Sequence, residues 1–151
     1  MRFTRFCTLF VAAAFYLSFT ACRDENDDTT FIIDPTETTV PDNAVDLSAN
    51  ETANCYIVKP GTTVAFSTAF KGNSTTESTG AVTGCRLLWT DNNGLIKDVK
   101  YAPGQRMAIV WTGELSGNAV IAATDADGNT LWSWHLWITD YDPAASAYTT
   151  P

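Results

Sequence analysis

From Asn54 onward, the sequence consists of short runs rich in β-branched and aromatic residues, and turn residues separate these runs. The Asn-Gly and Asp-Gly pairs among the separators suit the positive φ angles of tight hairpin turns. No segment keeps a 3.6-residue period, so the pattern does not support a helical layer. The runs predict seven strands, at Cys55–Val58, Thr62–Phe70, Cys85–Thr90, Leu95–Tyr101, Arg106–Thr112, Ala119–Thr124 and Thr130–Thr139. Seven short strands in about 90 residues are typical of an all-β fold, an immunoglobulin-like antiparallel β-sandwich, which we expect at residues 47–142.

The most informative run is Thr130–Thr139, because successive side chains of a strand point to opposite faces. The two faces carry Trp132, Trp134, Leu136 and Ile138 on one side, and Leu131, Ser133, His135 and Trp137 on the other. We expect the first set to lie in the core. The second set places His135 and Trp137 on the outer face of the sheet, where they form a candidate binding face. In the alternative interpretation both faces are covered and these two side chains only pack.

Two cysteines, Cys55 and Cys85, remain in the domain once the N-terminal segment is set aside. A pair of cysteines in an exported domain is expected to form a disulfide. Closing a loop of about 30 residues would stabilise the fold by roughly 3–4 kcal/mol in the chain-entropy model. The alternative is a pair of buried free thiols.

The N-terminus has the pattern of a secretory signal, because two arginines precede the apolar run Phe6 to Leu17, which is 12 residues long. Such a run is shorter than the roughly 20 residues that a membrane-spanning helix needs. Phe19-Thr20-Ala21-Cys22 follows and resembles the lipobox of bacterial lipoproteins, with phenylalanine where leucine is usual. The resemblance implies a signal peptide at 1–21 and a lipidated Cys22 that anchors the protein in the membrane. The alternative is an ordinary cleavage site with Cys22 as a stray thiol.

Residues 22–46 carry one arginine and eight acidic residues, so we expect an acidic, disordered and flexible tether. Acidic residues directly after Cys22 resemble the surface-export signal of Bacteroidota lipoproteins, although they could simply solvate the tether. Asp28-Thr29-Thr30 resembles the O-glycosylation motif of the same phylum, which makes Thr29 a possible modification site. The apolar patch Phe31–Ile33 could instead pair as an edge strand. Residues 143–151 form a C-terminal tail.

Several classes of chemistry are not supported by the residues present. A single histidine cannot build a multi-histidine metal site, and no nucleophile motif accompanies it. The segment Asp125–Asn129 resembles a calcium loop only briefly, because its glycine falls two positions early and Leu136 replaces the closing glutamate. A net charge of −8 without a basic stripe argues against nucleic acid as a partner. We therefore expect no enzyme activity, no cofactor and no metal site.

Two blocks near the C-terminus, Gly117–Ala123 and Gly128–Trp137, resemble a recurrent domain of Bacteroidota surface proteins that is often grouped with the fimbrillin-family lipoproteins. Ala53–Val58 and Leu87–Asp91 extend the match. The resemblance implies a β-sandwich, a lipid anchor in the outer membrane facing the cell exterior, and a role in surface adhesion. It supplies no catalytic residues.

Two functions follow from these observations. The first is a non-catalytic, lipid-anchored surface protein that acts in adhesion or with fimbriae through contacts with other surface proteins. The second is a surface glycan-binding module, because five Trp and five Tyr could include a stacking platform. Exposure of the aromatic rings discriminates between the two. A third interpretation, a domain of an envelope enzyme complex, has no positive support in the sequence.

Overall fold

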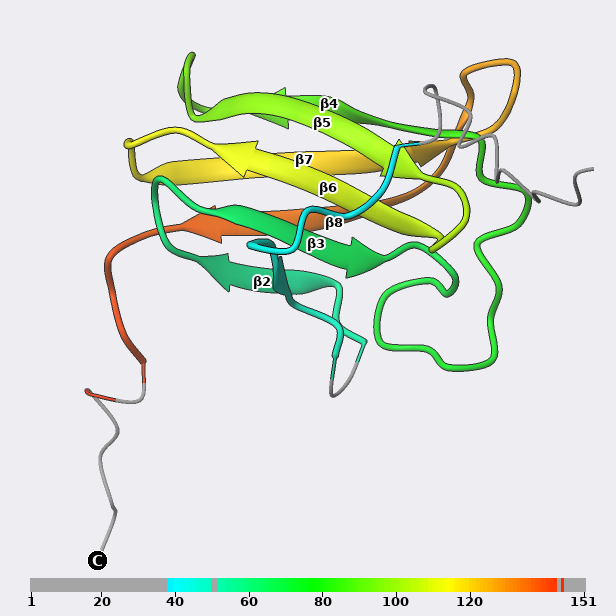
Figure 1. Ribbon diagram of the computed structural model, residues 1–151, viewed down its shortest axis with the longest axis horizontal. Coiled ribbons are helices and arrows are strands. Elements are labelled where there is room, and N and C mark those ends of the chain that lie inside the picture. The colour runs from blue at the N-terminus through cyan, green and yellow to red at the C-terminus, as the bar shows by residue number, and fades with distance from the viewer. Residues whose placement is uncertain (1–37, 50–51, 144, 146–151) are drawn as a thin grey trace, which may run out of the picture. The chain divides into compact units, whose positions relative to one another are not determined.

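Alternating apolar side chains fold the chain into two four-stranded sheets packed face to face, in a computed structural model that describes residues 38–49, 52–143 and 145 (Figure 1). The strands are β1 (Val45–Asp46), β2 (Cys55–Val58), β3 (Thr63–Ser67), β4 (Gly84–Thr90), β5 (Ile96–Ala102), β6 (Met107–Thr112), β7 (Gly117–Thr124) and β8 (Thr130–Ile138). No segment within these ranges is a helix long and apolar enough to span a membrane.

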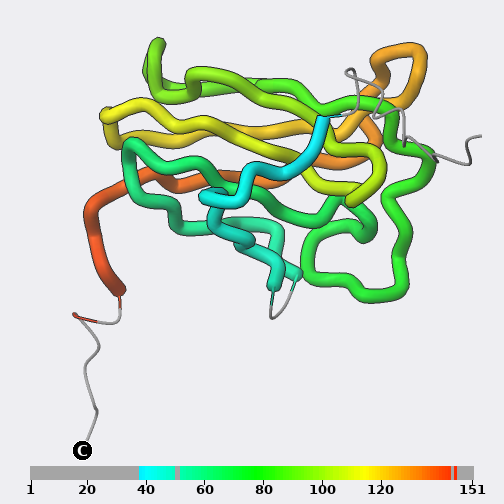
Figure 2. The backbone as a smooth tube through the Cα atoms, viewed as in Figure 1, coloured from blue at the N-terminus to red at the C-terminus, as the bar shows by residue number. Residues whose placement is uncertain are grey.

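The strand order is that of an immunoglobulin-like sandwich. One sheet has the order β1-β3-β6-β5 and the other β2-β8-β7-β4. If β3 to β8 are lettered B to G, the sheets contain B-E-D and G-F-C, which are the two sheets of that fold. Figure 2 follows the chain as it crosses between the layers. The predicted fold class is therefore confirmed, and the seven predicted strands correspond to β2–β8.

The two N-terminal strands are edge strands, and their pairing differs from that of a purely antiparallel sandwich. β1 pairs with β3 in parallel, and β2 pairs with β8 in parallel, so both sheets are mixed. β1 is an eighth strand that lies inside the segment assigned to the tether. The chain already contacts the domain at Val40, whose N–H donates to Gln105 Oε1 at 2.8 Å. A two-residue strand is too short to produce an alternating pattern, which is why the sequence does not predict it.

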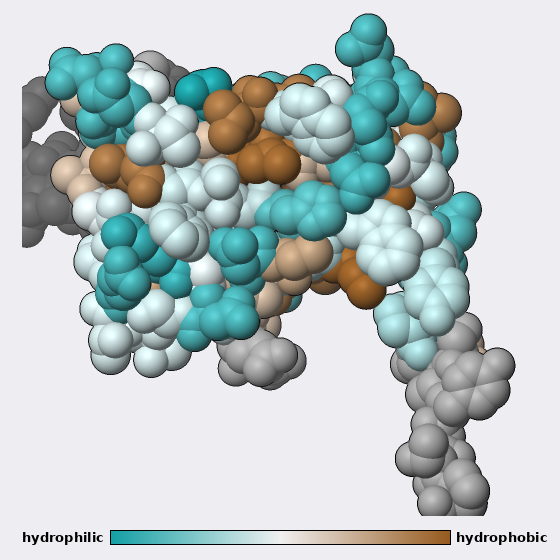
Figure 3. Space-filling view, turned by 180° about the vertical axis from the view of Figure 1, so that it is seen from behind, coloured by the Kyte–Doolittle hydropathy of each residue, from teal (hydrophilic) through white to brown (hydrophobic). Residues whose placement is uncertain are grey.

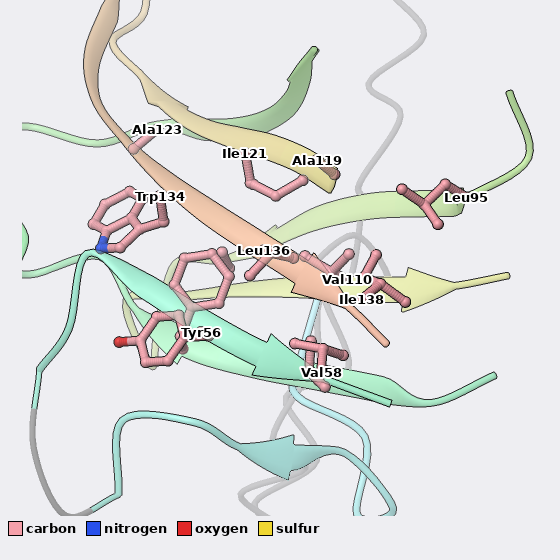
Figure 4. Packing of buried hydrophobic residues seen from close by; sticks show 13 residues of the cluster. Tyr56, Val58, Leu95, Val110, Ala119, Ile121, Ala123, Trp134, Leu136 and Ile138 are labelled. Carbon is pink, nitrogen blue, oxygen red and sulfur yellow. The ribbon is translucent and has the colours of Figure 1, made fainter. Parts of the chain in front are cut away.

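The core lies between the sheets and depends on aromatic packing (Figure 4). Phe66 of β3 packs against Tyr56 and Trp134 of the other sheet, with ring centroids 5.5 and 5.3 Å apart. Trp134, Leu136 and Ile138 are fully buried, and Trp132 packs partly buried against the same cluster. Burying each large side chain contributes about 1.5–3 kcal/mol, so this face of β8 stabilises the whole sandwich. The predicted phase of β8 is confirmed.

The predicted disulfide between Cys55 and Cys85 is wrong, because both thiols are free. β2 and β4 are the two opposite edges of one sheet, with β8 and β7 between them. Three strand spacings alone put the cysteines at least about 14 Å apart, twice the greatest Cα–Cα distance that a disulfide bridges, and Cys85 is also offset along the strands. Cys85 packs against the core, and burial raises the pKa of its thiol to about 12. Cys55 is exposed.

Candidate functional site

The side of the β2-β8-β7-β4 sheet that points away from the core carries large exposed apolar side chains. We call this side the outer face. Strand register places Cys55, His135, Val120 and Trp89 in one row across all four strands. A β-bulge between Leu87 and Trp89 shifts the register of β4. Trp89 thereby stands opposite Val120 and is 53% exposed. Figure 3 shows this side of the molecule, with hydrophobic atoms at the surface between hydrophilic ones.

A second row of the outer face contains Ile57, Trp137 and Asn118. Ile57 is 43% exposed and Trp137 is 40% exposed. Tyr141, just beyond the end of β8, stacks against Trp137 with ring centroids 6.1 Å apart and ring planes inclined by 26°. Trp137 and Tyr141 thus form a pair of neighbouring exposed rings beside Ile57.

Polar groups occupy the centre of this face as a chain of hydrogen bonds. Asp91 follows β4 and accepts from Asn118 twice, at Oδ1 from the backbone N–H and at Oδ2 from Nδ2, both at 2.9 Å. These hydrogen bonds hold the pKa of Asp91 below its ordinary value, the side-chain bond being the larger cause. A Cβ atom on Gly117 would collide with the Asp91 carboxylate, so the glycine leaves room for this contact.

The chain continues through the imidazole of His135. Its Nε2 lies 2.9 Å from Asn118 Oδ1, and its Nδ1 lies 3.1 Å from Cys55 Sγ. Since a carboxylate only accepts, Asn118 must direct its amide nitrogen to Asp91 and its oxygen to His135. His135 Nε2 is then the donor, which leaves Nδ1 as the acceptor for the Cys55 thiol. The hydrogen bonds therefore assign a single tautomer to His135.

Only part of this site could be predicted from the sequence. His135 and Trp137 lie on the outer face as predicted, Trp137 exposed and His135 half-buried. Cys55, Asn118 and Asp91 were not assigned to it, because they reach His135 only through pairing between distant strands. Of the three, only Asn118 could have been found from local sequence, because the register of the β7–β8 hairpin brings it near His135. Cys22 and Thr29 lie outside the described residues.

Two hollows lie at the open sides of the sandwich, where the edge strands of the two sheets meet. One, of about 270 Å³, lies between β4 and β5 and includes Cys85. The other, of about 250 Å³, lies beside β1, β2 and β3 and includes Val45, Leu47 and Ile57. Ile57 thus joins the second hollow to the outer face. Among the described residues, no three His, Cys, Asp or Glu side chains are placed to hold a metal ion.

Comparisons of the chain with protein-family models, with curated proteins and with solved structures find no match. The geometry of the outer face, together with the N-terminal sequence, therefore carries the functional argument.

Proposed function

We propose that this protein is a lipid-anchored cell-surface protein that acts in adhesion or with fimbriae, and that it binds other surface proteins through its outer face. The observation that carries the proposal is the set of exposed large side chains on one sheet and just beyond it: Ile57, Leu88, Trp89 and Trp137 on the strands, and Tyr141 after β8. Anchoring rests on the sequence Phe19–Cys22, which resembles a lipobox. In this proposal the acyl chains on Cys22 hold the protein in the outer membrane and its domain faces the exterior.

The composition of the outer face suits protein contacts. Trp and Tyr dominate the binding energy of protein interfaces when they become fully desolvated near the centre of a contact. Here two Trp and one Tyr surround a polar centre, Asn118 and His135, whose hydrogen bonds are already made within the domain. A partner can therefore cover the centre of this face without leaving those two polar side chains unpaired.

Glycan binding is the second candidate, and one specific observation favours it. Trp137 and Tyr141 are neighbouring exposed rings with nearly parallel planes. Sugar rings pack their C–H faces against such rings. Trp89 stands apart from this pair on β4, so a glycan bound at the pair alone would leave Trp89 uncovered.

The experiment that distinguishes protein binding from glycan binding modifies the cells that are bound and leaves this protein unchanged. Labelled full-length protein is added to cultured epithelial cells and to bacterial cells, after treatment with either trypsin or periodate. Binding to proteins predicts that trypsin removes retention and periodate leaves it. Binding to glycans predicts the reverse. Retention on none of the untreated surfaces would contradict an adhesive function.

A further inference from the structure

The geometry points to Cys55 as a nucleophilic thiol that His135 activates and that attacks the S–S bond of a disulfide. Cys55, His135 and Asn118 have the arrangement of a nucleophile, a base and the group that orients the base. Each link is within hydrogen-bond distance, 3.1 Å from sulfur to Nδ1 and 2.9 Å from Nε2 to Asn118. This inference stands independently of what the outer face binds.

The direction of the hydrogen bonds makes His135 a base toward Cys55 and not a competing donor. Asp91 fixes the amide of Asn118, and Asn118 fixes Nε2 of His135 as protonated. Nδ1 is therefore free to take the proton of the Cys55 thiol. The hydrogen bonds from Asn118 hold the pKa of Asp91 below its ordinary value, so Asp91 stays an acceptor that fixes the orientation of the Asn118 amide.

Cys55 is also more accessible than the second thiol of the domain, which is partly buried. Cys55 is exposed on the edge strand β2, whereas Cys85 packs against the core. Ile57 lies on the same face of the same strand, and Trp137 stands opposite Ile57 on β8. The surface beside the sulfur is therefore apolar and partly aromatic, which suits a disulfide with an apolar substituent.

A disulfide is favoured over an acyl group for a structural reason. Attack on a carbonyl needs N–H donors aimed at the developing oxyanion, and neither of the two hollows described above includes Cys55. Attack on sulfur needs only a thiolate with an open approach.

The reaction balances without an added oxidant. The Cys55 thiol gives its proton to His135 Nδ1, and the thiolate attacks one sulfur of the incoming disulfide. A new S–S bond forms to Cys55 while the original S–S bond breaks, and the departing thiolate takes the proton from Nδ1. Cys85 lies at the opposite edge of the sheet, so it cannot displace the product. Among the described residues no second thiol is therefore placed to resolve the mixed disulfide on Cys55, and an external thiol would reverse it.

The test measures the rate at which each cysteine of the full chain reacts with 2,2′-dithiodipyridine and with glutathione disulfide. The reaction is followed at pH 7, and mass spectrometry of peptides assigns the modified residue. A free cysteine has a pKa near 8.5, so only about 3% of it is thiolate at pH 7. We expect Cys55 to react at least about tenfold faster than free cysteine, and Cys85 to remain unmodified in the folded protein. The apolar surround predicts a larger advantage with the aromatic disulfide than with the charged one.

Variants test whether His135 and Asn118 cause the fast reaction of Cys55. His135→Ala should lower the rate of Cys55 to that of free cysteine, and added imidazole should restore part of it by acting as an external base. Asn118→Ala should show a smaller loss with the same rescue, because Asn118 positions His135. Ser133→Ala, on the same face of β8, is the matched control and should leave the rate unchanged. Tryptophan fluorescence checks that each variant is folded, and His135→Gln replaces His135→Ala if the latter is not.

Two outcomes would overturn the inference. One is a Cys55 rate within threefold of free cysteine in the wild-type chain. The other is a folded His135 variant that reacts as fast as the wild type, which would show that exposure alone explains the reactivity.

Discussion

Two tryptophans of β8, three positions apart, have opposite environments. Trp134 is 1% exposed and contacts Phe66, whereas Trp137 is 40% exposed and stacks on Tyr141. The difference follows from the two-residue repeat of a strand, because an odd separation places side chains on opposite faces. Trp134 therefore stabilises the fold, and Trp137 is available for contacts with other molecules.

Alanine substitution should separate these two roles by stability. Trp134→Ala removes a fully buried ring and should lower the free energy of unfolding by about 3–5 kcal/mol. Trp137→Ala removes an exposed ring and should change it by no more than about 1 kcal/mol. Urea denaturation followed by circular dichroism measures both values. Equal destabilisation by the two variants would show that both faces of β8 are buried in the working protein.

Pairing between strands decides which residues meet on the outer face. The strands and the phase of β8 could be predicted, because hydrophobic alternation and turn residues are local in sequence. The separation of Cys55 from Cys85 could not be predicted, since residue spacing does not show that β2 and β4 are opposite edges of one sheet. For the same reason the contact between Cys55 and His135, 80 residues apart, appears only once the parallel pairing of β2 and β8 is known.

The turn between β7 and β8 helps to set the register that brings Asn118 close to His135. Asp125 Oδ1 accepts from the N–H groups of Asp127 and Asn129, and Oδ2 accepts from Asn129 Nδ2. The bonds from Asn129 are the main cause of the lowered pKa of Asp125. The apparent calcium loop is thus a hydrogen-bonded turn.

The stability that Asp125 contributes should depend on pH in one direction. Because its pKa is lower in the folded state, the contribution is present above the unfolded value of about 3.9 and is lost as pH falls through the folded pKa. Asp125→Ala should lower the urea midpoint of unfolding at pH 7. At low pH the difference in midpoint between this variant and the wild type should become smaller. Asp127→Ala is the control, because its backbone donates to Asp125 whatever its side chain. A gap that stays constant down to pH 2 would contradict this role.

At the scale of the whole molecule, the proposal gives the N-terminal lipobox-like sequence and the outer face two different roles. The anchor holds the protein at the membrane, and the domain makes the contacts. The described chain meets the domain at Val40 and pairs with it from Val45, so the attachment reaches the β1 edge of the sandwich. The outer face belongs to the other sheet.

Removing the anchoring cysteine should detach the protein from membranes. Cys22→Ala leaves no thiol at the lipobox-like position to acylate, and in the proposal the acyl chains supply the attachment. Fractionation of cells should find the wild type with the membranes and the variant in the soluble fraction, and only the wild type should take up labelled fatty acid. Cys7→Ala, within the expected signal peptide, is the control that should stay attached.

The most direct measurement compares the retention of two full-length tryptophan variants on the cells that retain the wild type. Trp137→Ala alters the outer face, and Trp111→Ala alters the opposite sheet, where Lys100 lies 5.8 Å from the Trp111 ring. With melting temperatures matched, the account predicts that Trp137→Ala loses most of the retention and Trp111→Ala keeps it. Full retention by Trp137→Ala, or an equal loss in both variants, would contradict the assignment of binding to the outer face.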